Sequence, residues 1–89
     1  MNSKQLFYFV SVAETGSFTA AAQKLGLSQP PLSKQIMLLE EELGVILLKR
    51  GSRKAELTEE GTYLYGQAKN ILSMMDTAAQ ELSHFHGGQ

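Results

Sequence analysis

Cysteine is absent from all 89 residues of the chain. Without thiols the protein has neither a disulfide framework nor a thiolate zinc site, so its stability must come from packing and association. The sequence also lacks a charged-then-apolar leader and any apolar run of membrane-spanning length, because Glu, Lys or Gly interrupts the longest candidates. These absences predict a soluble protein with no membrane partner, in a reducing compartment such as the cytoplasm.

A net positive charge is missing as well, since the formal charge of the chain is −1. This total argues against a nucleic-acid partner, because neutralisation of phosphates by Lys and Arg supplies much of the binding free energy. The charge is segregated, however. Residues 24–54 hold six basic and three acidic side chains, a local charge of +3, whereas the remainder holds two basic and six acidic ones, a charge of −4. A basic surface can therefore form on a nearly neutral chain.

Catalytic groupings are also missing. The sequence has no nucleophile paired with a base, no metal-ligand spacing and no phosphate-binding loop, and its length leaves little room for a cleft. Glu40, Glu41 and Glu42 are adjacent, so they lie on different faces of a helix and make no acid–base pair. We expect them to face solvent, with Glu40 as a candidate structural residue. The chain is therefore predicted not to be an enzyme and to hold no cofactor and no metal.

The first part of the chain predicts two short helices in a folded domain of ordinary composition, 43% hydrophobic and 19% charged. Apolar residues recur at spacings of three and four between residues 3 and 14, which is one stripe of an amphipathic helix that Gly16 ends. Ser17 stands where an N-cap belongs, and the Ala-rich segment after it predicts a second helix closed by Gly26. The stripe of the first helix consists of Leu6, Phe9, Val10 and Ala13.

A third helix is predicted between Ser28 and Gly44. Pro30 and Pro31 fit its first turn, where N–H groups have no intrahelical partner, but they also deprive the Ser28 hydroxyl of a capping bond and leave it available to a phosphate. Two short helices joined by a glycine-containing turn form a helix-turn-helix. The apolar stripe of the third helix consists of Leu32, Ile36, Leu39 and Leu43.

Two short β-leaning runs follow, at residues 45–48 and 55–57, and a basic loop at residues 49–54 separates them. This arrangement predicts a β-hairpin with a basic tip, that is, a wing. Thr58 then stands as the N-cap of a fourth helix, whose first turn carries Glu59 and Glu60 to complement the helix dipole.

The fourth helix carries apolar residues at alternating spacings of four and three, the 3.5-residue repeat of a coiled coil. A lone helix cannot bury such a seam, so we expect it to pair with the same helix of a second copy in a two-fold homodimer. The predicted fold is thus mainly α, with a winged helix-turn-helix (three helices plus a two-stranded wing) at residues 1–58 and a linker or dimerisation helix with the start of a hinge at residues 59–89. The expected dimerisation residues are Leu64, Ala68, Ile71, Met75, Ala78, Leu82 and Phe85.

The order of these elements is typical of proteins that bind double-stranded DNA. In a helix-turn-helix the N-terminal residues of the second helix enter the major groove, where each base pair presents its own donor and acceptor pattern. Gln29 can address adenine bidentately, and Lys34 can donate to guanine. Pro30 offers an apolar contact to a thymine methyl group, and Ser33 is permissive. These four residues are the predicted base readers.

The basic residues of the wing are Arg50, Arg53 and Lys54. They suit phosphates or an adjacent minor groove, and would supply affinity more than discrimination. Two plainer interpretations stay open: the polar residues of the third helix form only a solvated face, and the basic loop is an ordinary soluble turn. A winged helix that binds protein through its hairpin and its coiled-coil helix is the alternative function, and it predicts no steep salt dependence of DNA affinity.

One set of residues carries a family pattern across essentially the whole domain: Phe9, Ala13, Gly16, Ser17, Ala21, Ala22, Leu25, Ser28, Gln29, Pro30, Ser33, Gln35, Ile36, Leu39, Glu40, Leu43, Gly44, Leu47, Arg50, Leu57, Thr58 and Gly61. This pattern resembles the LysR-type transcriptional regulators. Two positions depart from it: Leu48 stands where the family usually has Phe, and Pro31 where a small residue is commoner.

The resemblance implies a bacterial regulator whose helix-turn-helix spans about residues 18–37 and whose linker helices pair antiparallel. Such a regulator would act at the nucleoid on a pseudo-palindromic operator. The resemblance also implies a tetrameric full-length form, whose C-terminal effector-binding domain is absent from this chain and would be the only route to a small-molecule effector. The DNA contacts of the family fall on Gln29, Pro30, Ser33 and Lys34 in the recognition helix, on Arg50 and Arg53 near the wing, and on Ser17, Thr19 and Gln35 as phosphate contacts.

Overall fold

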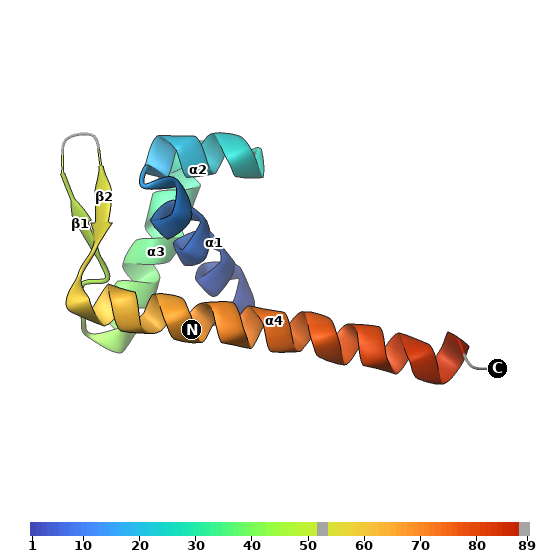
Figure 1. Cartoon of the computed structure of the whole chain (residues 1–89). Coiled ribbons are helices and arrows are strands. Elements are labelled where there is room, and N and C mark those ends of the chain that lie inside the picture. Colours follow the sequence, from blue (N-terminus) through green and yellow to red (C-terminus); the bar gives the residue numbers. More distant parts are fainter. Residues whose placement is uncertain (52–53, 88–89) are drawn as a thin grey trace.

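The computed structural model describes residues 1–51 and 54–87. In chain order these form α1 (Ser3–Thr15), α2 (Phe18–Leu25), α3 (Gln29–Leu43), β1 (Leu48–Arg50), β2 (Ala55–Leu57) and α4 (Glu59–Gly87). The first three helices pack together, the two-stranded wing lies beside α3, and α4 passes along one side and extends far beyond the rest (Figure 1), so that the molecule measures 54 × 26 × 19 Å. The predicted winged helix-turn-helix with a long following helix is confirmed.

The ends of the helices are where the sequence placed them. The Ser17 hydroxyl accepts a hydrogen bond from the Ala20 N–H at 3.1 Å and caps α2. Gly16 and Gly26 follow α1 and α2 with φ of 72° and 69°, left-handed values that cost a residue with a Cβ more than they cost glycine. Ser28 is the N-cap residue of α3 but its side chain makes no capping bond, as the two prolines require.

The core lies where α1, α2 and α3 meet. Its largest fully buried side chains include Phe9, Leu32, Ile36 and Leu39, all from the predicted stripes. Leu43, the last residue of the α3 stripe, is 38% exposed instead and lines a hollow with Tyr63 and Leu64 of α4. The helix stripes otherwise hold, and α1 adds Val12, a fully buried residue outside its predicted stripe.

The first strand of the wing is shifted along the chain relative to its prediction, whereas the second lies at residues 55–57 as predicted. The two strands pair antiparallel, with Leu48 opposite Leu57 and Arg50 opposite Ala55, so the first strand includes basic residues expected in the loop. The strand begins only at Leu48, because the N–H group of Leu47 before it donates to the carboxylate of Glu40 instead of to a strand partner. The Leu48 N–H donates to the same carboxylate. Leu48 is 1% exposed and fills the position where the family usually has Phe. Arg53 lies outside the described residues.

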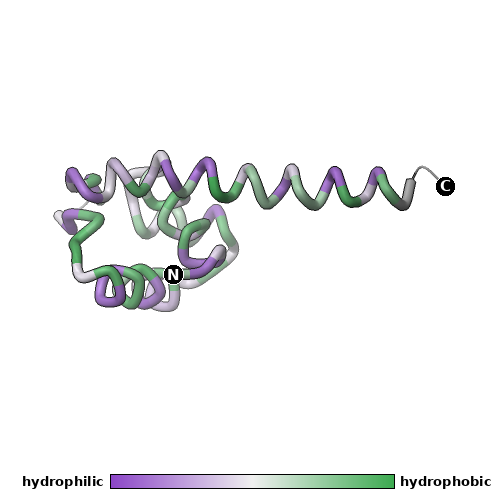
Figure 2. The backbone as a smooth tube through the Cα atoms, turned by 90° about the horizontal axis from the view of Figure 1, so that it is seen from below, coloured by the Kyte–Doolittle hydropathy of each residue, from purple (hydrophilic) through white to green (hydrophobic). Residues whose placement is uncertain are grey.

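Only the later part of the α4 seam is free for a second copy. Ala68 is fully buried against the core of its own chain, which corrects its assignment as a dimer contact, whereas Leu64 is half-buried there and its role in the dimer stays a prediction. The reason is that α1 packs along the first turns of α4, where the Tyr65 hydroxyl also donates to Glu14 at 2.9 Å. Beyond that contact Ile71, Met75, Ala78, Leu82 and Phe85 are exposed, and Figure 2 shows apolar positions recurring along this projecting half of the helix. Among the described helices none combines the length and hydropathy needed to cross a bilayer.

Candidate nucleic-acid interface

Three segments far apart in the sequence converge on one surface: the start of α2, the start of α3 and the wing. A depression of about 420 Å³ lies between them. The strands of the wing extend toward the side of the molecule that carries α2, away from α4 (Figure 1). Six of the predicted contact residues line this depression, namely Ser17, Thr19, Gln29, Ser33, Arg50 and Lys54. The structure thus brings together residues that were predicted from separate motifs.

The first two turns of α3 carry the predicted base readers. Gln29 and Ser33 are four residues apart, one above the other on the helix face that lines the depression. Pro30 and Lys34 occupy the adjacent strip of the helix, four residues apart in the same way, and both are exposed. Ser28 is exposed just before the helix, with its hydroxyl free of any capping bond. A polar, exposed and rigid helix end of this kind can present donors and acceptors to base edges.

The N-terminal end of α2 faces the same depression. Ser17 caps the helix, and Thr19 is exposed in its first turn. Unpaired N–H groups and the helix dipole make such an end favourable for an anion. The wing is fastened to this corner by a backbone hydrogen bond of 2.9 Å from the Ala55 N–H to the Gly16 carbonyl. The start of α2 and the wing, which carry expected phosphate contacts, are therefore held at a fixed spacing.

Arg50 differs from its prediction as a residue of the basic tip. It lies within β1, and its Nη2 donates to Glu40 Oε1 at 3.1 Å. Its guanidinium carbon lies 4.9 Å from the centre of the Phe18 ring, a cation–π distance. Arg50 still lines the depression, so it faces the surface while being held from two sides. Lys54, by contrast, is exposed and lies in the loop just before β2.

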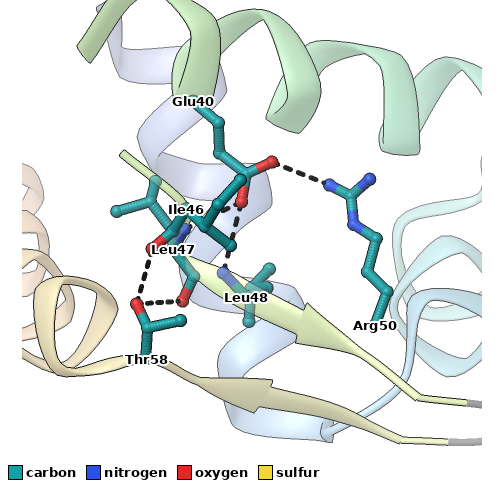
Figure 3. A network of polar contacts seen from close by, with 6 residues as sticks. All are labelled: Glu40, Ile46, Leu47, Leu48, Arg50 and Thr58. Carbon is teal, nitrogen blue, oxygen red and sulfur yellow. Dashed lines mark hydrogen bonds and ion pairs between the residues drawn. The ribbon is translucent and has the colours of Figure 1, made fainter. Parts of the chain in front are cut away.

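Glu40 has a structural role that the sequence offered only as an alternative to solvent exposure. It is 7% exposed, and its Oε2 accepts from the N–H groups of Leu47 and Leu48 at 2.8 and 3.2 Å, while its Oε1 accepts from Arg50 (Figure 3). The expectation that it faces solvent is wrong, and the alternative of a structural role is correct. Its position four residues after Ile36, on the buried side of α3, was the signal in the sequence.

Gln35, an expected phosphate contact, has a partner within the chain. Its Oε1 accepts from Gln5 Nε2 at 3.4 Å, and its side chain is half-buried between α3 and α1. It does not line the depression. Its role as a phosphate contact stays a prediction that would require this weak bond to exchange for one to DNA.

Comparison with known proteins decides the family. Residues 3–62 match the family described as bacterial regulatory helix-turn-helix protein, lysR family. The chain belongs to the LysR family. It is 54% identical over 76 residues to the transcriptional regulator BenM of Acinetobacter baylyi and 51% identical over 81 residues to the regulator BudR of Raoultella terrigena. These matches cover 85% and 91% of the chain but only 25% and 28% of the two relatives, so the chain spans about a quarter of their length.

Solved structures of LysR-family domains superpose on nearly the whole chain. A complex of the BenM DNA-binding domain with catB site 1 DNA matches with a TM-score of 0.96 and 47% identity, covering 100% of this chain and 99% of that one. A complex of the CbnR DNA-binding domain with DNA matches with a TM-score of 0.93 and 40% identity, covering 97% and 99%. The relatives are transcriptional regulators, which confirms the expectation that this LysR-family chain is not an enzyme.

Proposed function

We propose that this chain is the operator-reading domain of a bacterial transcriptional regulator, binding double-stranded DNA with α3 in the major groove and the wing on the backbone or an adjacent minor groove. The observation that carries the proposal is the convergence of six separately predicted polar and basic residues on one depression between α2, α3 and the wing. Support comes from the solved structures of BenM and CbnR domains, which are DNA complexes of the same fold.

Base reading and backbone binding fall to different parts of the surface in this proposal. Gln29, Pro30, Ser33 and Lys34 read base edges, because they stand on the first two turns of a rigid helix. The start of α2 and the wing hold phosphates and fix the register of that helix on the duplex. The proposed backbone contacts are Ser17, Thr19, Ser28, Gln35, Arg50, Arg53 and Lys54.

Dimerisation through α4 completes the proposal. An antiparallel pair centred between residues 76 and 77 brings Ile71 of one copy opposite Leu82 of the other and Met75 opposite Ala78, because the alternating four-and-three spacing reads alike in both directions. Exposed apolar residues along this half of α4 then lose their contact with water. Two copies related by a two-fold axis would present their α3 helices to half-sites about one helical turn apart, on a pseudo-palindromic operator.

The remaining elements of the proposal concern the longer protein. Residues 1–58 are the winged helix-turn-helix and residues 59–89 the linker helix with the start of a hinge. Because the relatives are about four times as long as the matched segment, we place an effector-binding domain after the hinge, with a small-molecule effector and a tetrameric assembly. Such a regulator would act in the bacterial cytoplasm, at the nucleoid.

The test is a titration of the 89-residue chain with a duplex selected for binding and with a scrambled duplex, at several salt concentrations. Affinity for both should fall steeply with salt, by a slope of about 0.9 per phosphate contacted. The variant Lys34→Ala should lose about 5- to 100-fold of its preference for the selected duplex, since a good base contact discriminates by about 1–3 kcal/mol. Lys4→Ala removes the same charge from the start of α1 and should leave the preference intact.

A winged helix that binds only protein is the competing function, and the same titration separates the two. That function predicts a shallow salt dependence and no difference between the two duplexes. If the parent chain binds both duplexes equally, the operator-reading proposal is wrong. If the parent discriminates and Lys34→Ala discriminates equally well, only the assignment of Lys34 is wrong.

A further inference from the structure

The carboxylate of Glu40 joins the recognition helix to the wing. It comes from the fourth turn of α3, is 7% exposed, and accepts hydrogen bonds from two consecutive backbone N–H groups at the entry to β1. The same carboxylate accepts from Arg50 at the far end of that short strand. One side chain thus holds the strand at both its ends (Figure 3).

Arg50 extends this connection to α2. Its guanidinium lies between the Glu40 carboxylate and the ring of Phe18, at 3.1 Å from an oxygen of the first and 4.9 Å from the centre of the second. Phe18 is the first residue of α2 and lines the depression together with Arg50. A planar guanidinium suits such a place, because it can donate in its plane and stack through its face. The three segments of the proposed DNA surface therefore meet at one ion pair.

We propose that Glu40 is a positioning residue for DNA binding, which acts through Arg50 to hold the wing at the spacing from α3 that lets both engage one duplex. The proposal deepens the proposed function and rests on it. Glu40 is too buried to touch DNA, so its effect must pass through the residues it holds. An ordered wing brings its phosphate contacts to the duplex together with the recognition helix, without an ordering cost at the moment of binding.

The positioning role and the change of charge predict opposite effects of the substitution Glu40→Gln on DNA affinity. It removes a negative charge from a protein that binds a polyanion, so the charge change alone predicts tighter binding. The Gln side chain keeps an acceptor for the two backbone N–H groups but loses the charge that holds Arg50. Positioning therefore predicts weaker binding. Glu41→Gln is the matched control, because it makes the same charge change at the next, exposed residue of α3.

The experiment measures affinity of the full chain for the selected duplex as a function of salt. We expect Glu40→Gln to bind about tenfold more weakly than the parent, the scale of a hydrogen bond to a charged group. The salt slope should become shallower by about one phosphate contact, because a displaced wing loses its grip on the backbone. Glu41→Gln should bind as tightly as the parent or more tightly, with an unchanged slope. A loss of folded protein alone would reduce the active fraction without changing the slope.

Arg50→Lys carries the test if Glu40→Gln fails to fold, since it keeps the charge while losing the planar fork and the stacked face. It should lower affinity and make the salt slope shallower, as expected for Glu40→Gln. Where Glu40→Gln folds, the double variant should be no worse than the poorer single one, because both act through one ion pair. Glu40→Gln equal to Glu41→Gln, or additive losses in the double variant, would overturn the positioning role. A parent chain without sequence preference would instead overturn the proposed function.

Discussion

Gly61 lies where the first turn of α4 presses against the backbone of the wing. A Cβ at this position would overlap the carbonyl oxygen of Leu47, and would lie 3.1 Å from Cδ2 of Leu57. The obstacle is a backbone carbonyl that already accepts from the Thr58 N–H at 3.0 Å and from the Thr58 hydroxyl at 3.2 Å. The same hydroxyl accepts from the Gly61 N–H at 2.9 Å and caps α4. An added methyl group therefore cannot enter without separating α4 from the wing.

The size of the effect follows from these contacts. Overpacking a tight site costs about 1–3 kcal/mol, and each hydrogen bond lost at Leu47 adds about 1 kcal/mol. The better helix propensity of Ala returns about 1 kcal/mol. We expect Gly61→Ala to lower the free energy of unfolding by about 3 kcal/mol, and thus to lower Tm by roughly 10–25 °C in a domain of this length.

Gly66→Ala is the matched control, because Gly66 lies in the same helix with nothing within 4 Å of an added Cβ. It should raise the free energy of unfolding by about 0.5–1 kcal/mol. Thermal and urea unfolding followed by circular dichroism measure both variants, at one fixed protomer concentration because the chain is proposed to dimerise. Equal stability of Gly61→Ala and Gly66→Ala would refute the close approach of α4 to Leu47.

Two further predictions concern the helix caps and the dimer. Ser17→Ala should lower the free energy of unfolding by about 1 kcal/mol, because it loses the hydrogen bond from the Ala20 N–H. Ser28→Ala, at a cap that makes no such bond, should change it by less than about 0.5 kcal/mol in the same unfolding assay. Equal losses in the two variants would contradict this account of the caps. Leu82→Asp, on the exposed α4 seam, should raise the dimer dissociation constant at least about tenfold in sedimentation equilibrium. Ser83→Asp, off the seam, should leave that constant unchanged. A larger effect of Ser83→Asp than of Leu82→Asp would exclude the seam as the dimer contact.

Local rules were enough to predict the order and limits of the elements. Glycine and serine mark helix ends through their own conformational and capping preferences, so Gly16, Ser17 and Gly26 could be interpreted without knowledge of the fold. The recognition-helix residues were equally accessible, because their exposure depends on helical periodicity and on the neighbouring stripe.

The errors came from tertiary contacts that periodicity does not encode. A 3.5-residue repeat does not state which partner covers it, and α1 of the same chain covers Ala68. The first strand of the wing starts late because a glutamate from α3 accepts from the Leu47 N–H, which an earlier strand would use. Arg50 was predicted in the basic loop, because its neighbours in the sequence are basic or small. In the structure it is the last residue of β1, where it pairs with Glu40 and stacks on Phe18. Each case depends on a contact between residues seven or more positions apart, which belong to different elements.

Selection of bound sequences from a random duplex pool by the 89-residue chain tests the central claim most directly. Two α3 helices related by the two-fold axis of an α4-paired dimer should enrich an inverted repeat with half-sites about 10 base pairs apart, centre to centre. The enriched bases should change when Gln29 or Lys34 is replaced by Ala and should not change when Lys4 is replaced. A pool that stays random after repeated rounds at moderate salt would contradict the account of this surface as a reader of DNA sequence.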